Sequence, residues 1–375
     1  MKIIFMFVNV DWFFFSHRLP IAKAAQKNNV KMIVYTDFTQ PQEKNNNDGY
    51  DLYQSPIRRT SKSIFHVIFE FFKSYLIIKN GKPDLIHAVT IKPILVLGLV
   101  ARLTSTPFVG AVSGLGPAFQ PNSWYRKLRL TLIVRVFRLI FDNRKARIIC
   151  QSKNDRDVLV DHGITPSANV SLIPGSGVDV EVFSPIKKRA DCEKYVLMSS
   201  RILSDKGVKE YCLAAQIVRA KLGDVVKFKL SGPIDTHSPT FISESELTKL
   251  TVSCGVEYLG NRQDMPELLA SALIFVLPSY YAEGVPKILL EASASGVAIV
   301  TTDHPGCRDA VVEGETGLLV ATRDAESLAG AVMELLKNRI LLSQMGSKGR
   351  ALAESAFRDS EVVDRHYRLY WQLCK

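Results

Sequence analysis

Short apolar runs rich in β-branched and aromatic residues alternate with helix-length segments along most of this chain. This alternation restricts the possible folds more than any other feature. It is typical of parallel βαβ units, in which helices cover both faces of a sheet. In the first half we expect a polar loop at 39–54, helices at 18–27, 62–79 and 124–141, and strands at 2–10, 31–36, 84–88, 108–112, 147–151 and 170–173.

The alternation stops at residues 183–194 and then begins again. That stretch lacks periodicity and contains Pro185 and a Lys-Lys-Arg run, which is typical of a linker. Beyond it we expect strands at 195–199, 226–230, 256–259, 273–277 and 298–301, and an almost wholly helical part from 324 to 374. The expected organisation is therefore a Rossmann-like domain at 1–182, a linker at 183–194, a second Rossmann-like domain at 195–355, and a helix at 356–375 that crosses back to the first domain. Two such domains predict a ligand in the cleft between them, beyond the carboxyl ends of the strands.

The net charge of +11 is unevenly distributed. Residues 1–180 carry 24 Lys and Arg against 12 Asp and Glu, and the remainder carries 24 against 25, so the halves contribute +12 and −1. The N-terminal half therefore predicts an anionic partner on its side alone. No uncharged apolar run approaches the roughly 18 residues of a membrane span. The six cysteines form no CxxC pair, which argues against a cysteine-based zinc site.

The stretch YYAEGVPKILLEASASG, residues 280–296, carries two carboxylates, Glu283 and Glu291. Pro286 suits the first position of a helix that ends at Gly296, so Glu283 precedes this helix and Glu291 lies inside it. The free N–H groups of a first helical turn favour phosphate, and carboxylates accept hydrogen bonds from sugar hydroxyls. A sugar nucleotide would satisfy both. The alternative is that both glutamates are simply solvated.

Two cations are expected at the same edge of the second sheet. SSRILSDKG, residues 199–207, places Arg201 and Lys206 where the first strand of the second half turns into a helix. A pyrophosphate suits one planar guanidinium and one ammonium. A strand-end arginine is also commonly structural, so the pairing with the two glutamates carries the hypothesis.

Three stretches of the C-terminal half resemble a known family: RILSDKG (201–207), EGVPKILLEASASG (283–296) and TTDHPGCRDAVVEGETGLLV (301–320). In this order they are similar to the retaining glycosyltransferases of family 4, whose α/β GT-B fold has two Rossmann-like parallel-sheet domains facing a cleft, with C-terminal helices packing back. FFFSHRLPIAKAA, DLIHAVTIKP and FVGAVSGLG are more loosely similar to the bacterial branch that builds O-antigen, capsule and other oligosaccharides on a polyprenyl diphosphate lipid.

The resemblance implies a role for each candidate residue. The N-terminal domain would bind the acceptor and the C-terminal domain the nucleotide sugar. Arg201 and Lys206 would bind the diphosphate, Glu291 the ribose and Glu283 the donor sugar. Further donor or acceptor contacts would come from Gly284, Val285, Pro286, Lys287 and Asn261 in the second half and Ser16, His17, Ser113 and Gly114 in the first. No cofactor and no metal is expected.

Two features depart from the family pattern. Many relatives have a glycine pair in the first loop, whereas NVDWFFFSHRLP has none, so Ser16, His17 or the following helix would replace that contact. Many relatives also have a histidine where this chain has Ser113. For the mechanism, front-face attack is the leading hypothesis, and double displacement with Glu283 as nucleophile is the alternative.

Partners follow from the same reasoning. The donor would be a UDP-sugar (UDP-GalNAc, Gal, Glc or GlcNAc) and the acceptor a lipid-linked glycan. The segment 122–148 is basic and apolar around much of its helical circumference, which predicts peripheral binding to an anionic membrane at the inner, cytoplasmic face. A core helix with solvated arginines is the alternative. Nucleic acid is not expected as a partner. The rival functions are a GT-B sugar-nucleotide epimerase and a non-catalytic GT-B binding protein.

Overall fold

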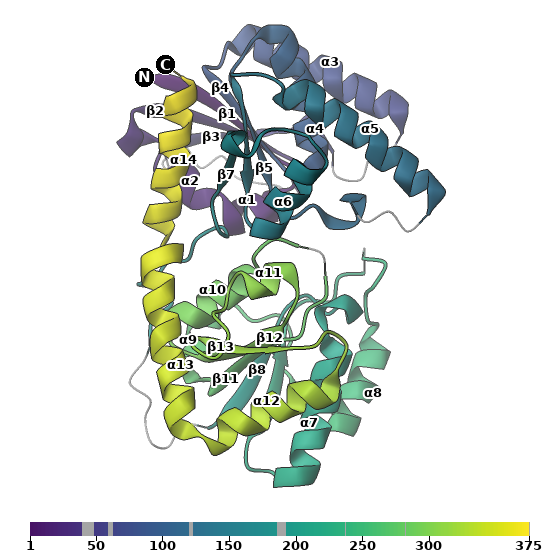
Figure 1. Cartoon of the computed structure of the whole chain (residues 1–375), viewed down its shortest axis with the longest axis vertical. Helices are drawn as coiled ribbons and strands as arrows, with labels where there is room; N and C mark the ends of the chain where they lie inside the picture. The colour runs from purple at the N-terminus through teal and green to yellow at the C-terminus, as the bar shows by residue number, and fades with distance from the viewer. Residues whose placement is uncertain are drawn as a thin grey trace. The chain divides into compact units, whose positions relative to one another are not determined.

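The computed structural model describes residues 1–39, 49–58, 63–119, 123–185, 193–236, 238–281 and 283–374. The chain forms two compact units (Figure 1). Unit 1 consists of Met1–Ser176 and Asp359–Lys375, and unit 2 of Gly177–Arg358. Part of the expected linker, residues 186–192, lies outside the described residues, as does most of the expected 39–54 loop.

Unit 1 is built on a seven-stranded parallel sheet in the order β3-β2-β1-β4-β5-β6-β7. Since the strand order reverses beside β1, the carboxyl ends of β1 and β4 form the switch point where α/β sheets bind ligands. The strands are β1 (Lys2–Val8), β2 (Val30–Thr36), β3 (Tyr50–Gln54), β4 (Leu85–Val89), β5 (Phe108–Val112), β6 (Ala146–Cys150) and β7 (Val170–Leu172).

Helices cover both faces of this sheet because its central strands are apolar on both sides. Along β1, Phe5 and Phe7 pack with α3–α6, whereas Ile4 and Met6 pack with α1, α2 and α14 (Figure 1). The helices are α1 (Asp11–His17), α2 (Leu19–Lys23), α3 (Ile64–Gly81), α4 (Ile91–Thr104), α5 (Trp124–Phe141), α6 (Lys153–Asp161) and α14 (Asp359–Leu373), with short 3-10 turns at Gln26–Asn28, Gly116–Phe119 and Ser167–Asn169.

The last helix of the chain, α14, packs in unit 1 against α2. The Tyr370 hydroxyl hydrogen-bonds His87 Nδ1 of β4 at 2.6 Å, and the Tyr367 hydroxyl donates to the carbonyl oxygen of Ile21 at 2.9 Å. Both tyrosines are buried, so their hydroxyl groups need these partners. These hydrogen bonds tie the end of the chain to its first 90 residues.

Unit 2 has a six-stranded parallel sheet in the order β10-β9-β8-β11-β12-β13, with its switch point between β8 and β11. α7 packs against α8 and α12, and α10 against α9 and α13. The strands are β8 (Tyr195–Ser199), β9 (Lys227–Ser231), β10 (Val256–Tyr258), β11 (Ile274–Leu277), β12 (Ala298–Thr302) and β13 (Gly317–Val320). The helices are α7 (Val208–Leu222), α8 (Glu244–Cys254), α9 (Met265–Ser271), α10 (Lys287–Ala294), α11 (Pro305–Arg308), α12 (Ala325–Lys337) and α13 (Arg339–Leu352), with a 3-10 turn at Ser204–Lys206 and a π-helical turn at Ala353–Phe357.

Two local expectations for unit 1 were wrong. Residues 50–54, expected within a loop, form β3, and the supposed first loop forms helix α1. β3 is an edge strand paired only with β2, so it needs little apolar sequence. In α1 the buried Asp11 carboxylate accepts hydrogen bonds from the N–H groups of Trp12 (2.7 Å) and Thr39 (2.8 Å), which holds the first turn.

Candidate functional site

The switch point of unit 2 brings together the residues on which the sequence argument rests. Arg201 lies two residues beyond the last residue of β8, and Glu283 lies in the loop that follows β11. β8 and β11 are neighbouring parallel strands, so their carboxyl ends meet at one edge of the sheet. This is where a doubly wound α/β domain binds ligands.

Lys206 and Glu283 form an ion pair across this switch point. The Lys206 side chain is only 8% exposed, and its Nζ lies 5.0 Å from the centre of the Tyr281 ring. Gly207 follows with φ +81°, and a Cβ there would lie 2.2 Å from the carbonyl oxygen of Pro278. A glycine is therefore required for the backbone to turn this closely against the loop that leads to Glu283.

Arg201 is held by Asp235, whose Oδ2 lies 2.8 Å from the guanidinium Nη1. The Tyr281 ring centre is 5.8 Å from Arg201 Cζ. Burial disfavours the cation, but the hydrogen bond that Arg201 donates to Asp235 and its interactions with Tyr281 together outweigh burial, so the pKa of Arg201 is raised above its ordinary value. Arg201 is thus a fixed cation beside Lys206, with Tyr281 adjoining both.

Helix α10 carries the second carboxylate. Glu291 is its fifth residue, and the Oε1 atom lies 3.7 Å from the Lys287 Nζ in the first turn. Gly296 follows the helix with φ +67°, which confirms it as the residue that ends the helix. Pro286, expected as the first helical residue, is instead the N-cap, with extended ψ of 123°. The difference is one residue, since proline's fixed φ also suits the N-cap.

The backbone between Glu283 and Pro286 is fixed by the segment after β12. Gly284, Val285 and Pro286 are buried, and a Cβ on Gly306 of α11 would lie 2.3 Å from the carbonyl oxygen of Gly284. The conformation of the 283–286 loop therefore depends on Gly306, which α10 and β12 separate from it in the chain.

Asn261 is exposed and lies three residues beyond the edge strand β10. β9 separates β10 from β8 in the sheet.

The candidate residues of unit 1 lie at its own switch-point side. The buried Arg18 donates from Nη1 to the carbonyl oxygen of His17 (3.0 Å) and from Nη2 to Ser113 Oγ (3.2 Å). It thereby links the end of α1 to the loop after β5. The His17 ring stacks on Phe13 with 4.2 Å between ring centres.

The two remaining candidates of unit 1 have local structural roles. Ser16 Oγ donates to the Trp12 carbonyl oxygen at 2.8 Å. Gly114, one residue beyond Ser113, has φ +105°, a backbone conformation that glycine adopts without strain.

Three neighbours of these residues were not predicted: Asp235, Tyr281 and Arg18. Tyr281 and Arg18 are each within two residues of a candidate, and their aromatic or cationic character was a usable signal. Asp235 lies 34 residues beyond Arg201 in a loop with no recognisable motif. Only the fold brings the two together.

In the described part of the chain, no group of three or more His, Cys, Asp or Glu side chains could hold a metal ion, and no helix is both long and apolar enough to cross a bilayer.

The chain matches two family models, one in each half, which overlap at residues 179–197. Residues 19–197 match "Glycosyltransferase Family 4", and residues 179–352 match "Glycosyl transferases group 1". It is 29% identical over 371 residues to the N,N'-diacetylbacillosaminyl-diphospho-undecaprenol alpha-1,3-N-acetylgalactosaminyltransferase of Campylobacter jejuni, covering 96% of this chain and 95% of the relative. It is 24% identical to the UDP-Gal:alpha-D-GlcNAc-diphosphoundecaprenol alpha-1,3-galactosyltransferase of Escherichia coli, covering 79% and 77%.

The fold has close structural relatives. The sucrose-phosphate synthase of Thermosynechococcus elongatus superposes with a TM-score of 0.79 at 20% identity, covering 100% of this chain and 99% of that structure. This likeness and the two parallel sheets confirm the predicted GT-B fold class. With a family 4 model matching its first half and a group 1 model its second, the chain belongs to the family 4 glycosyltransferases.

Proposed function

We propose that this glycosyltransferase moves a sugar from a UDP-sugar to a polyprenyl-diphosphate-linked glycan in surface polysaccharide biosynthesis, with retention of configuration and without a metal ion. The observation that carries the proposal is the cluster at the unit 2 switch point, where two cations and a carboxylate adjoin the helix that bears Glu291. The names of the C. jejuni and E. coli relatives support the acceptor class, and the E. coli name supports a UDP-activated donor.

In this proposal each group has one role. Arg201 and Lys206 bind the diphosphate, Glu291 binds the ribose hydroxyls and Glu283 the donor sugar. Both cations are already paired, but an ammonium has three N–H donors and a guanidinium five. Each can therefore keep its carboxylate partner and still donate to phosphate.

The acceptor hydroxyl attacks the anomeric carbon from the face that the diphosphate leaves. The new C–O bond forms as the bond to phosphate breaks, and the proton of the hydroxyl passes to the departing phosphate oxygen. Arg201 and Lys206 stabilise the charge that develops there, an effect that can be worth several kcal/mol. Glu283 is ion-paired with Lys206, which weakens it as a nucleophile and favours front-face attack over double displacement.

Unit 1 would bind the acceptor and α5 the membrane. Six residues of α5 are buried, while Lys127, Arg129 and Arg135 are exposed together with Trp124 and Leu128. A basic helix with exposed aromatic and aliphatic groups suits an anionic interface, here the inner face of the cytoplasmic membrane. Liposome co-sedimentation tests this. Equal binding with and without anionic lipid, and at low and high salt, would contradict an electrostatic contribution to membrane binding.

A donor panel tests the function. The protein is incubated with a polyprenyl-diphosphate-linked acceptor and one of UDP-GalNAc, UDP-Gal, UDP-Glc or UDP-GlcNAc. The mass of the lipid product is then measured by mass spectrometry. We expect one donor to lengthen the acceptor by one sugar, with EDTA present. Conversion of the nucleotide sugar to an epimer without acceptor would indicate the epimerase. UDP binding without any product would indicate a binding protein.

A further inference from the structure

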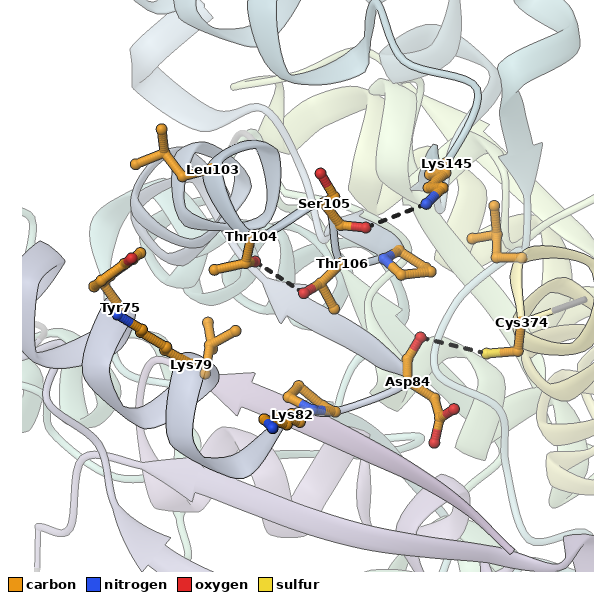
Figure 2. Close-up of a pocket in the computed structure, with 14 residues that line it drawn as sticks. Tyr75, Lys79, Lys82, Asp84, Leu103, Thr104, Ser105, Thr106, Lys145 and Cys374 are labelled. Carbon is orange, nitrogen blue, oxygen red and sulfur yellow. Dashed lines mark hydrogen bonds between the residues drawn. The ribbon is translucent and has the colours of Figure 1, made fainter.

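A cavity of about 550 Å³ lies at the amino edge of the unit 1 sheet (Figure 2). Asp84, Pro107 and Lys145, which line it, directly precede β4, β5 and β6. Parallel strands all begin at one edge, so the cavity is at the opposite edge from His17 and Ser113. It is therefore separate from the candidate transfer site.

Three lysines from three segments border this cavity. Lys79 belongs to the last turn of α3, Lys82 follows α3 directly, and Lys145 precedes β6. None of them forms an ion pair with a described residue, and Lys145 Nζ donates only to the Ser105 carbonyl oxygen, at 3.4 Å. The lysines thus place unneutralised positive charge around one cavity.

The remaining polar lining also suits an anion. The Ser105 hydroxyl lies between α4 and β5, whereas the Thr104 hydroxyl donates to the Val100 carbonyl oxygen (3.0 Å) and is hydrogen-bonded to the Thr106 hydroxyl (2.8 Å; Figure 2). Among the described residues that line the cavity, Asp84 is the one acid, and its carboxylate accepts hydrogen bonds from Lys2 Nζ (3.0 Å) and the Ile3 N–H (2.8 Å). Its charge is therefore already balanced.

Two lining residues adopt a backbone conformation that favours glycine. Lys82 has φ +43° and Ser105 has φ +55°, each at the C-cap of its helix. A glycine would adopt either conformation with less strain. The local fold therefore gives no reason for a lysine or a serine there, and a ligand would.

An apolar stripe on α3 leads to the cavity. Phe65, Phe69, Phe72 and Leu76 follow helical spacing on one face and are 79%, 55%, 60% and 55% exposed, and Lys79 continues the same spacing. Exposed aromatic and aliphatic groups beside lysines are typical of a surface that enters the headgroup region of a membrane.

We propose that this cavity binds a phosphate group, and that the α3 stripe selects the phosphate of an anionic lipid headgroup over free phosphate. The lysines supply the charge, the Ser105 hydroxyl donates to a phosphate oxygen, and the stripe holds the adjoining acyl chains. The site needs no sugar donor, so its test is independent of the proposed transfer reaction.

The test compares the full chain with a triple variant, Lys79→Gln, Lys82→Gly and Lys145→Gln. Inorganic phosphate and, separately, phosphatidylglycerol vesicles are titrated, with the amide NMR shifts of Lys82, Asp84 and residues 104–106 as the readout. A control, Lys221→Gln, Lys249→Gln and Lys337→Gln, removes the same charge from exposed positions of unit 2. We expect about 100-fold weaker binding in the triple variant, an unchanged control, and no loss of melting temperature from Lys82→Gly.

The sources are separated by Phe69→Ser with Phe72→Ser. For a lipid headgroup, this variant loses vesicle binding but keeps phosphate binding. A different result would be that phosphate shifts the cavity amides while vesicles of phosphatidylglycerol and phosphatidylcholine bind equally. That result would support the phosphate site but contradict an anionic lipid as its ligand. No shift with either probe, or equal loss in the triple variant and its control, would overturn the proposal.

Discussion

At the residue scale, the site depends on cations that the protein itself holds in place. Lys206 is paired with Glu283 and Arg201 with Asp235, and Tyr281 adjoins both cations. Carboxylates that fix these side chains before substrate arrives reduce the cost of orienting them during the reaction. In the proposed mechanism the pairs thus connect the packing of the β8 and β11 loops to charge stabilisation in the transition state.

Substitutions separate the two roles proposed for this cluster. Lys206→Ala should lower kcat about 100-fold, a larger effect than its loss of UDP affinity, since it removes charge stabilisation at the departing phosphate. Glu291→Ala should weaken UDP binding about tenfold, the loss of a hydrogen bond to a charged group. Steady-state kinetics and calorimetry measure both. Lys209→Ala, an exposed lysine paired with Glu246, is the control and should change neither. Unchanged kinetics and UDP affinity in both site variants would rule out these roles.

Sequence reasoning predicted this cluster only in part. Lys206 and Glu283 are 77 residues apart, yet the alternation of strands and helices placed both at strand carboxyl ends. Asp235 could not be predicted, because its role depends on how the loop after β9 folds back over Arg201. No local pattern encodes that path.

At the scale of elements, central strands were predicted well, and of the edge strands β7 and β10 were predicted whereas β3 and β13 were not. β5 and β8 begin and end where expected, because strands buried on both faces must be apolar. β3 and β13 lie at sheet edges and were missed, since half of an edge strand's neighbours are solvent.

Close packing between elements predicts how the Glu283 loop responds to mutation. Gly306→Ala places a Cβ 2.3 Å from the carbonyl oxygen of Gly284 and 2.6 Å from that of Glu283. Both distances are too short, so the loop must shift. We expect transfer activity to fall at least tenfold, with about 1–3 kcal/mol of destabilisation. Gly330→Ala in α12 meets no atom within 4 Å and should stabilise unit 2 by about 1 kcal/mol without affecting activity. Kinetics and urea unfolding test this pair, and full activity in Gly306→Ala would contradict the loop's role.

The docking of α14 predicts a pH dependence. His366 is buried beside Arg18, His87 and Tyr370, and burial lowers its pKa from 6.5 to about 3. Between these values the unfolded chain binds a proton that the folded chain does not. The free energy of unfolding is therefore highest above pH 6.5. It falls by about 1.4 kcal/mol per pH unit as the pH drops from 6.5 towards 3.

Tryptophan fluorescence isolates this effect, because Trp12, Trp124 and Trp371 all lie in unit 1. Urea unfolding at pH 7, 6 and 5 should show this decline in the free energy of unfolding. His366→Gln should reduce the slope of that free energy against pH by the equivalent of about one proton. His66→Gln, on the exposed face of α3, should leave the slope unchanged. Equal slopes for wild type and His366→Gln would contradict the account.

At the scale of the whole molecule, the two α/β units differ in net charge. Residues 1–180 carry a net charge of +12, whereas the remainder is near neutral. The basic unit suits an acceptor and a membrane that are both anionic, and unit 2 concentrates its cations at one switch point. The uneven charge and the two sheets were evident from sequence, but the α3 stripe and its adjoining cavity required the structure.

The most direct test of the central claim is NMR of the new glycosidic linkage formed from an α-linked UDP-sugar on a polyprenyl-diphosphate-linked acceptor. Front-face transfer at the unit 2 site predicts an α-linked product, formed about 100-fold more slowly by Lys206→Ala under the same single-turnover conditions. A β-linked product, or an α-linked product formed equally fast by Lys206→Ala, would contradict the account.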